Sequence, residues 1–236
     1  KRPKAAKLQG AQKPIDSWSY RDRSQADLID YRSDPQHLIP RDLTSPVCQW
    51  LLVVKDHFAR TVYTRPITQK CPIIVGFELT QFFSFAGYPL ILHTDNGSEF
   101  GNDVLKEMKR LNPQMVCVTG RVRTPRDQGS VERANQDVKE IIASRVFDAR
   151  QACEEEEQRK YITWTTEAAA AARSMNASYS RGTGNVEPYE LVFHHKYHAP
   201  MVESLMMVQD FSCPETLEDL SQYLSLEYIA KLRNLG

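Results

Sequence analysis

Short apolar runs alternate with longer stretches of helical periodicity along most of the chain. Residues 25–31, 50–54, 61–66, 90–92 and 115–118 have the length and composition of strands. Apolar positions recur at helical spacing in residues 73–85, 102–111, 155–172 and 217–232, and from Gly129 onward. Residues 33–46 contain three prolines and predict a long connection. This order of strands and helices predicts an α/β domain with a mixed sheet covered by helices.

Two of these segments predict which side chains share a face. In the strand at 25–31, Ala26 and Leu28 face one way and Asp27 and Ile29 the other. The strands at 50–54 and 61–66 are joined by a short turn and predict a hairpin. The helix from Gly129 has an apolar stripe and, near its opposite side, a set of polar residues: Glu132, Asn135, Gln136 and Lys139.

The composition indicates a globular protein. The chain has 236 residues, of which 41% are hydrophobic and 25% charged, enough to bury a sizeable core. No apolar run approaches the ~20 residues that a membrane-spanning helix needs, so we expect no membrane association. The five cysteines are widely spaced and odd in number, which favours a reducing compartment over a disulfide framework.

The formal net charge of zero conceals an uneven distribution. Residues 1–150 carry 23 basic and 17 acidic side chains, whereas residues 151–236 carry 7 and 13. The first stretch can face a polyanion, and the alternative explanation is an ordinary solvated basic surface. We expect a basic arm at 1–20, a core at 21–150, a helical continuation at 151–200 and an acidic C-terminal helical extension at 201–236.

Three acidic residues lie in or next to segments predicted to be strands or helices, where burying a charged carboxylate costs free energy. Asp27 lies within an apolar strand, Asp95 directly follows another, and Glu132 lies in the first turn of a helix. A carboxylate near a buried sheet must be hydrogen-bonded, ion-paired or bound to a cation. Each has an ordinary structural explanation by itself: a satisfied carboxylate, an Asp-Asn-Gly turn and a favourable interaction with the helix dipole. The combination indicates a site.

Two sequence motifs contain two of these acids. The segments HTDNGSEF at 93–100 and DQGSVERAN at 127–135 resemble the paired signature of retroviral and retrotransposon integrase catalytic cores. Residues 25–30 are similar to that family's first catalytic strand, and residues 54–60 to the strand and turn after it. The resemblance extends over roughly residues 12–193. It is nearest to integrases of Ty3/Gypsy elements and to domesticated KRAB-A-domain-containing integrase-like proteins.

The resemblance implies a ribonuclease-H-like fold: a five-stranded mixed sheet flanked by helices. The helical spacing at residues 217–232 adds a helical C-terminal extension to this expectation. It maps Asp27, Asp95 and Glu132 onto the acidic triad, with Asp30 as the competing first acid. The implied cofactor is Mg²⁺ or Mn²⁺, with two ions when DNA is bound, because three carboxylates and a phosphate suit hard cations. No small-molecule cofactor is expected.

The resemblance also implies the substrate and its contacts. The expected activity is DNA 3′-end processing and strand transfer, in the nucleus or in the cytoplasm before nuclear entry, by a homodimer or higher multimer. Gln128 and Gly129 are expected to form a loop beside the metal ions. The residues expected to contact DNA are Asn96, Arg121, Arg123, Gln128, Asn135 and Lys139, with Arg126 as a further backbone contact.

The chain departs from the family pattern at several points. Between Asp95 and Glu132 lie 36 residues, one more than is usual, Asp127 adds a negative charge, and Gln136 replaces a frequent lysine. Neither the zinc module that precedes such cores nor the basic β-barrel that follows them is recognisable. Two alternatives therefore stay open: a catalytically inactive domesticated domain that binds DNA or a chromatin partner, and a ribonuclease-H-type nuclease on RNA–DNA hybrids.

Overall fold

The computed structural model describes residues 17–94, 100, 102–119, 125–179 and 183–197, and describes residues 102–104, 107, 119 and 125–132 by their backbone alone. These residues divide into two compact units, one within residues 1–176 and the other within residues 177–236. The first unit contains a sheet and most of the helices. No described helix has both the length and the apolar character required to cross a membrane.

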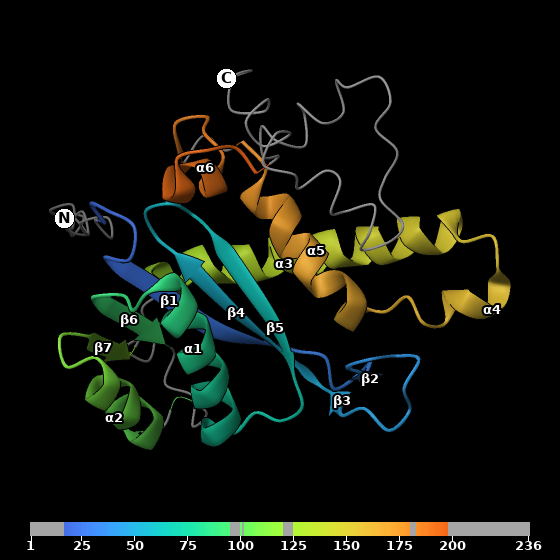
Figure 1. Ribbon diagram of the computed structural model, residues 1–236, viewed down its shortest axis with the longest axis horizontal. Helices are drawn as coiled ribbons and strands as arrows, with labels where there is room; N and C mark the ends of the chain where they lie inside the picture. Colours follow the sequence, from blue (N-terminus) through green and yellow to red (C-terminus); the bar gives the residue numbers. More distant parts are fainter. Residues whose placement is uncertain (1–16, 95–99, 101, 120–124, 180–182, 198–236) are drawn as a thin grey trace, which may run out of the picture. The chain divides into compact units, whose positions relative to one another are not determined.

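The main sheet has five strands in the order β5-β4-β1-β6-β7 (Figure 1). The strands are β1 (Arg23–Asp30), β4 (Trp50–Asp56), β5 (Val62–Ile67), β6 (Ile91–Thr94) and β7 (Val116–Thr119). The pairs β1–β4 and β4–β5 are antiparallel, whereas β1–β6 and β6–β7 are parallel. The expected mixed sheet is confirmed. The expected hairpin of residues 50–54 and 61–66 is also confirmed, as the antiparallel pair β4–β5.

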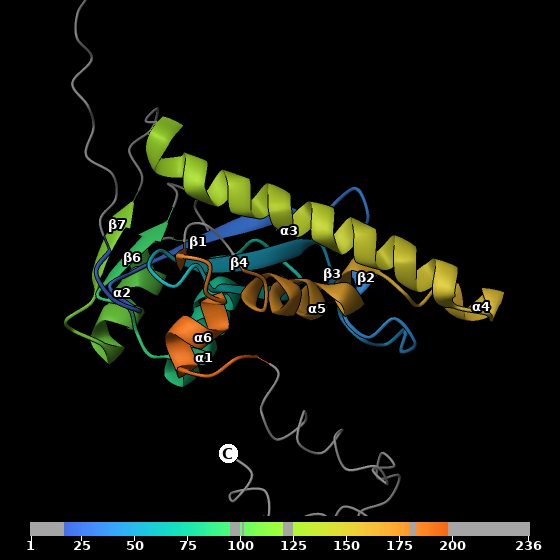
Figure 2. The ribbon, with the colours of Figure 1, turned by 90° about the horizontal axis from the view of Figure 1, so that it is seen from above.

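Helices cover both faces of this sheet, as Figure 2 shows from above. On one face lie α1 (Pro72–Ala86) and α2 (Asn102–Leu111), and on the other α3 (Pro125–Ala152) and α5 (Trp164–Asn176). Ala26 and Leu28 belong to the core under α1 and α2, and Ile29 to the core under α3 and α5. The two faces predicted for the first strand are therefore confirmed. A layer of buried apolar side chains lies between each face of the sheet and the helices that cover it.

The prediction of one continuous helix at 155–172 is wrong, because the structure has two helices there. The structure has a short α4 (Glu156–Arg159) followed by α5, which begins at Trp164. Thr163 precedes the new helix, and its backbone N–H donates to Thr166 Oγ1 at 3.1 Å. This bond is the reciprocal half of a capping box, so the two threonines start a second helix where periodicity alone predicted one continuous helix.

Two further boundaries differ from expectation. Residues 33–46 are not an uninterrupted connection, because β2 (Gln36–His37) pairs there with β3 (Val47–Cys48). The long helix α3 begins at Pro125 and not at Gly129. Proline is favoured at the first position of a helix because its φ angle is already helical and its missing N–H would have no partner there.

The second unit contains α6 (Pro188–Phe193) and the residues around it. Its ring contacts are local: Tyr189 packs against Phe193 and Tyr197 with centroid distances of 4.4 and 4.8 Å. The backbone N–H of Tyr197 donates to the carboxylate of Glu187 at 3.2 Å. The helix expected at 217–232 lies outside the described residues.

Candidate active site

The first element of the site is the parallel pair β1 and β6 at the centre of the sheet. Ala26 of β1 is paired with Thr94 of β6. Asp27 is the next residue of β1, and Asp95 is the next residue of the sequence after Thr94. Asp95 itself lies outside the described residues. The carboxyl ends of parallel strands meet at one edge of a sheet, which is where α/β proteins place their ligands.

The second element is helix α3, which is tied to β1 by a direct hydrogen bond. Asn135 Nδ2 donates to Asp27 Oδ2 at 2.6 Å. The other carboxylate oxygen of Asp27 accepts from the backbone N–H of Leu28 at 2.8 Å. Glu132 belongs to the same helix, three residues before Asn135, and residues three apart share a helix face. Its backbone is described and its side chain is not.

Asp27 and Asn135 together bring oxygen atoms of the kind that bind hard cations to one place, because Asn135 donates directly to the Asp27 carboxylate. The side-chain oxygen of Asn135 is buried and has no hydrogen-bond partner among the described residues. Buried amide oxygens normally have a partner, and Mg²⁺ with its waters takes oxygen ligands. The residues in place therefore fit a hard divalent cation.

A complete metal cluster does not appear in the part of the chain that the structure describes. The described residues contain no group of three or more His, Cys, Asp or Glu side chains that could hold a metal ion. Two of the three predicted ligands are not among the described side chains, because Asp95 is undescribed and Glu132 is described by its backbone alone. The triad of Asp27, Asp95 and Glu132 therefore stays a prediction.

Asp30, the competing first acid, has a different environment. It is the last residue of β1 and lies beyond the segment paired with β6. Its carboxylate accepts from Arg32 through Nε at 3.0 Å and through Nη2 at 2.6 Å. These hydrogen bonds hold the pKa of Asp30 at about 2. The side chain is exposed and already ion-paired, which favours Asp27 as the residue at the site.

The predicted DNA contacts divide into described and undescribed residues. Lys139 is exposed on α3, four residues after Asn135 and so on the same face. Asn96, Arg121 and Arg123 lie outside the described residues. The loop expected at residues 128–129 is wrong, because both residues lie within α3; a helix that starts at Pro125 leaves no loop there.

A polar layer next to Asp27 escaped the sequence analysis. Gln25 precedes Asp27 by two residues and so faces the same side of the sheet. His57 Nε2 lies 3.2 Å from Gln25 Oε1, and both side chains are buried. Burial, and secondarily the positive charge of Lys55, lowers the pKa of His57 to about 4. Burial also lowers the pKa of Lys55 itself.

Asp56, the acid between those two residues, has a structural role. Its Oδ1 accepts from the backbone N–H groups of Phe58 and Ala59 at 3.0 and 2.7 Å, and its Oδ2 from that of Arg21 at 3.1 Å. Burial nevertheless raises the pKa of this carboxyl group. The acid fixes the turn between β4 and β5. Turn-forming aspartates are recognisable in sequence, whereas the burial of His57 is not.

The described fold matches solved integrase structures. The catalytic core domain of BIV integrase aligns with a TM-score of 0.52 and 21% identity, over 74% of this chain and 95% of that one. The HTLV-2 integrase catalytic core in complex with magnesium, in its trimeric form, aligns with a TM-score of 0.54 and 17% identity, over 74% and 97%. The simian T-cell lymphotropic virus intasome in complex with the PP2A regulatory subunit B56 gamma aligns with a TM-score of 0.55 and 16% identity, over 77% and 57%.

The sequence itself is similar over part of its length to a characterised protein. It is 33% identical over 96 residues to human KRAB-A domain-containing protein 2, which corresponds to 41% of this chain. The match spans only 20% of the length of that protein. No family model matches the chain. The expected ribonuclease-H-like fold is confirmed by the structural matches, and the resemblance to integrase cores no longer depends on short motifs alone.

Proposed function

Since the chain has the fold of retroviral integrase catalytic cores, we propose that it is an integrase-like polynucleotidyl transferase that processes DNA 3′ ends and joins them to a target strand. The observation that supports this proposal best is the bond between Asn135 and Asp27. It brings the helix that contains Glu132 onto the strand that contains Asp27, beside the parallel strand whose last residue, Thr94, immediately precedes Asp95.

Each acid has a role in this proposal. Asp27, Asp95 and Glu132 would hold Mg²⁺ or Mn²⁺. When bound, such ions stabilise the negative charge that builds on the attacking and leaving oxygens of a phosphodiester displacement. Asn135 positions Asp27 through its hydrogen bond to Oδ2, which fixes the orientation of the carboxylate. Of the solved structures above, one is an integrase core in complex with magnesium.

DNA would lie along α3. Lys139 is exposed one turn beyond Asn135 and can contact a phosphate. Asn96, Arg121, Arg123 and Gln128 are proposed as further contacts from the segments that flank the acids. Residues 1–150, which include the three acids, carry 23 basic and 17 acidic side chains, and this excess of positive charge favours DNA as the ligand.

The proposal is tested with a branched DNA disintegration substrate and a titration of Mg²⁺ or Mn²⁺. We expect metal-dependent cleavage and rejoining that Glu132→Gln abolishes. The matched control is Glu140→Gln, which makes the same change on the same helix at an exposed residue. Activity that survives Glu132→Gln removes that residue from the site, and inactivity of the wild-type chain with both metals contradicts the proposed transferase.

The second candidate is a domesticated domain that binds DNA or a chromatin partner in the nucleus without catalysis. It is favoured by the zero net charge and by the acidic balance of residues 151–236. Binding of DNA that needs no divalent metal and is unaffected by Glu132→Gln, in a chain that cleaves nothing, supports this candidate against the first.

We propose further that the active species is a homodimer or higher multimer that uses an apolar stripe on α1. Ile73, Phe77 and Phe85 are 84%, 59% and 88% exposed. A stripe of large apolar side chains in water indicates an interaction surface. The HTLV-2 integrase core is described in dimeric and trimeric forms, and a second copy of this chain is the occupant proposed for the stripe.

A further inference from the structure

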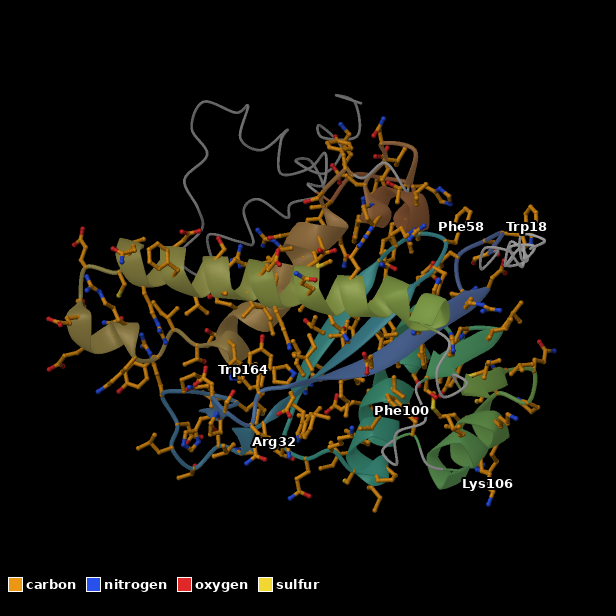
Figure 3. The ribbon with its side chains drawn as sticks, turned by 180° about the vertical axis from the view of Figure 1, so that it is seen from behind. Trp18, Arg32, Phe58, Phe100, Lys106 and Trp164 are labelled. Atoms are coloured by element: carbon orange, nitrogen blue, oxygen red, sulfur yellow. The ribbon has the colours of Figure 1, made fainter. Side chains whose placement is uncertain are left out.

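A separate pocket lies between the end of β1, helix α3 and the start of α5. Its volume is about 600 Å³, within the range of ~300–1,000 Å³ that is typical of small-molecule sites. Asp27 does not line it, so the pocket is distinct from the acid site. In Figure 3, Trp164 lies beside α3, and Arg32 follows the end of β1.

The floor of the pocket is aromatic and rigid. Tyr31 and Trp164 are stacked with ring centroids 4.2 Å apart and planes inclined by 13°. Trp164 Nε1 donates to the backbone oxygen of Asp34 at 2.7 Å, which fixes the indole. A third ring, Phe147, lines the same pocket and is 63% exposed. An exposed phenyl ring in a concave site presents a face on which a flat ligand can stack.

Two basic side chains line the pocket at different points along α3. Lys139 and Arg150 both line it from α3 and are eleven residues apart, or about 16 Å along the helix axis. Arg150 Nε donates to the backbone oxygen of Ile162 at 2.9 Å, which holds its guanidinium at the α5 end. Asp30 also lines the pocket, but its carboxylate is ion-paired with Arg32 at 2.6 Å.

The pocket continues the acid site along α3. Lys139 is four residues from Asn135, and Asn135 donates directly to Asp27. A DNA strand with one phosphate at the acids therefore reaches Lys139 after about 6 Å and Arg150 after about 22 Å of helix. Phe147 lies between these two cations on α3, and a basic track with aromatic platforms is the arrangement of proteins that bind unpaired strands.

We propose that this pocket binds an unpaired nucleobase of the DNA strand, stacked on Phe147, while Lys139 and Arg150 contact phosphates of the strand on either side of that nucleotide. The inference rests on the proposed function, because it takes the strand from the acid site. Asp34, which lines the pocket, can accept a hydrogen bond from the exocyclic amino group of the base. Burial raises the pKa of Tyr31 to about 12, so its hydroxyl stays neutral beside the phosphates.

The test measures binding without chemistry. Glu132→Gln protein in EDTA is titrated with a labelled blunt duplex and with the same duplex that has a short unpaired overhang, by fluorescence anisotropy. We expect tighter binding of the overhang. Phe147→Ala removes a ring without disturbing the core and should weaken overhang binding at least about five-fold, since stacking is worth ~1–3 kcal/mol per base, and leave blunt-duplex binding unchanged. The matched control is Trp18→Ala, which removes an aromatic side chain that is 83% exposed and lies elsewhere.

A second variant fills the pocket without removing a contact. Ala143 is exposed and lines the pocket, so Ala143→Trp should abolish the preference for the overhang while unfolding at the same denaturant concentration as the parent. Equal affinity of the parent for both DNAs, or a preference that neither variant alters, overturns the pocket assignment. A preference that both variants remove supports it even if the chain cleaves no DNA, so failure of the transferase proposal is distinguished from failure of this one.

Discussion

The buried histidine next to the candidate site makes the stability of the fold depend on pH. His57 is 9% exposed, and its pKa falls from 6.5 in the unfolded chain to about 4 in the folded one. Between these values the unfolded chain binds the proton and the folded chain does not, so acid favours unfolding. Because each pKa unit corresponds to 1.36 kcal/mol, the free energy of unfolding falls by about 3 kcal/mol as the pH falls from 6.5 towards 4.

The assay is urea unfolding at a series of pH values from 7.5 to 4.5, for wild type and for His57→Gln. Glutamine stays polar and does not titrate, so the readout is the slope of the unfolding free energy with pH and not its absolute value. The wild type should lose about 2 kcal/mol more than the variant over this range. His195→Gln, which removes an exposed histidine, is the matched control. Parallel curves for wild type and His57→Gln would refute the reasoning.

Three other perturbations follow from the structure. Asp95→Asn and Glu132→Gln should each abolish turnover in the disintegration assay while the urea midpoint stays unchanged or rises, because removing one carboxylate relieves repulsion among the acids. Asn176→Ala should lower the unfolding free energy by about 2 kcal/mol, since its side chain accepts from the N–H of Val62 at 2.7 Å and donates to the oxygen of that residue at 2.8 Å; an unchanged urea midpoint would exclude a stabilising role. Phe77→Lys on the exposed stripe of α1 should make the chain monomeric in sedimentation at high concentration, and an unchanged sedimentation profile would count against that interface.

The strands and most helices could be predicted because their side chains follow the geometry of the backbone. Ala26 and Ile29 enter different cores as the alternation of a strand requires. The choice between Asp27 and Asp30 could not be made from the pattern, since both lie in one strand. It depends on the pairing of β1 with β6, which ends at Ala26 next to Asp27, and on the ion pair between Arg32 and Asp30. Both are visible only in the folded structure.

The features that the sequence did not reveal are those made by contacts between distant residues. The two-residue pairing of β2 with β3 is too short to have a period. The interruption before α5 depends on the hydroxyl of Thr166, which is a local signal that apolar periodicity conceals. The pocket under Phe147 joins the end of β1 to the start of α5, more than 130 residues away, and no local pattern indicates it.

The bond between Asn135 and Asp27 also bears on when the site forms during synthesis. Its partners are 108 residues apart in sequence, and contacts of such separation form late because the loop between them must first be closed. A nascent chain can complete β1, β4 and β5 as a local antiparallel meander long before α3 exists. The strand that contains Asp27 and the helix that contains Asn135 therefore come together only in a chain that has nearly finished folding, so a stalled or truncated product lacks the arrangement proposed to cut DNA.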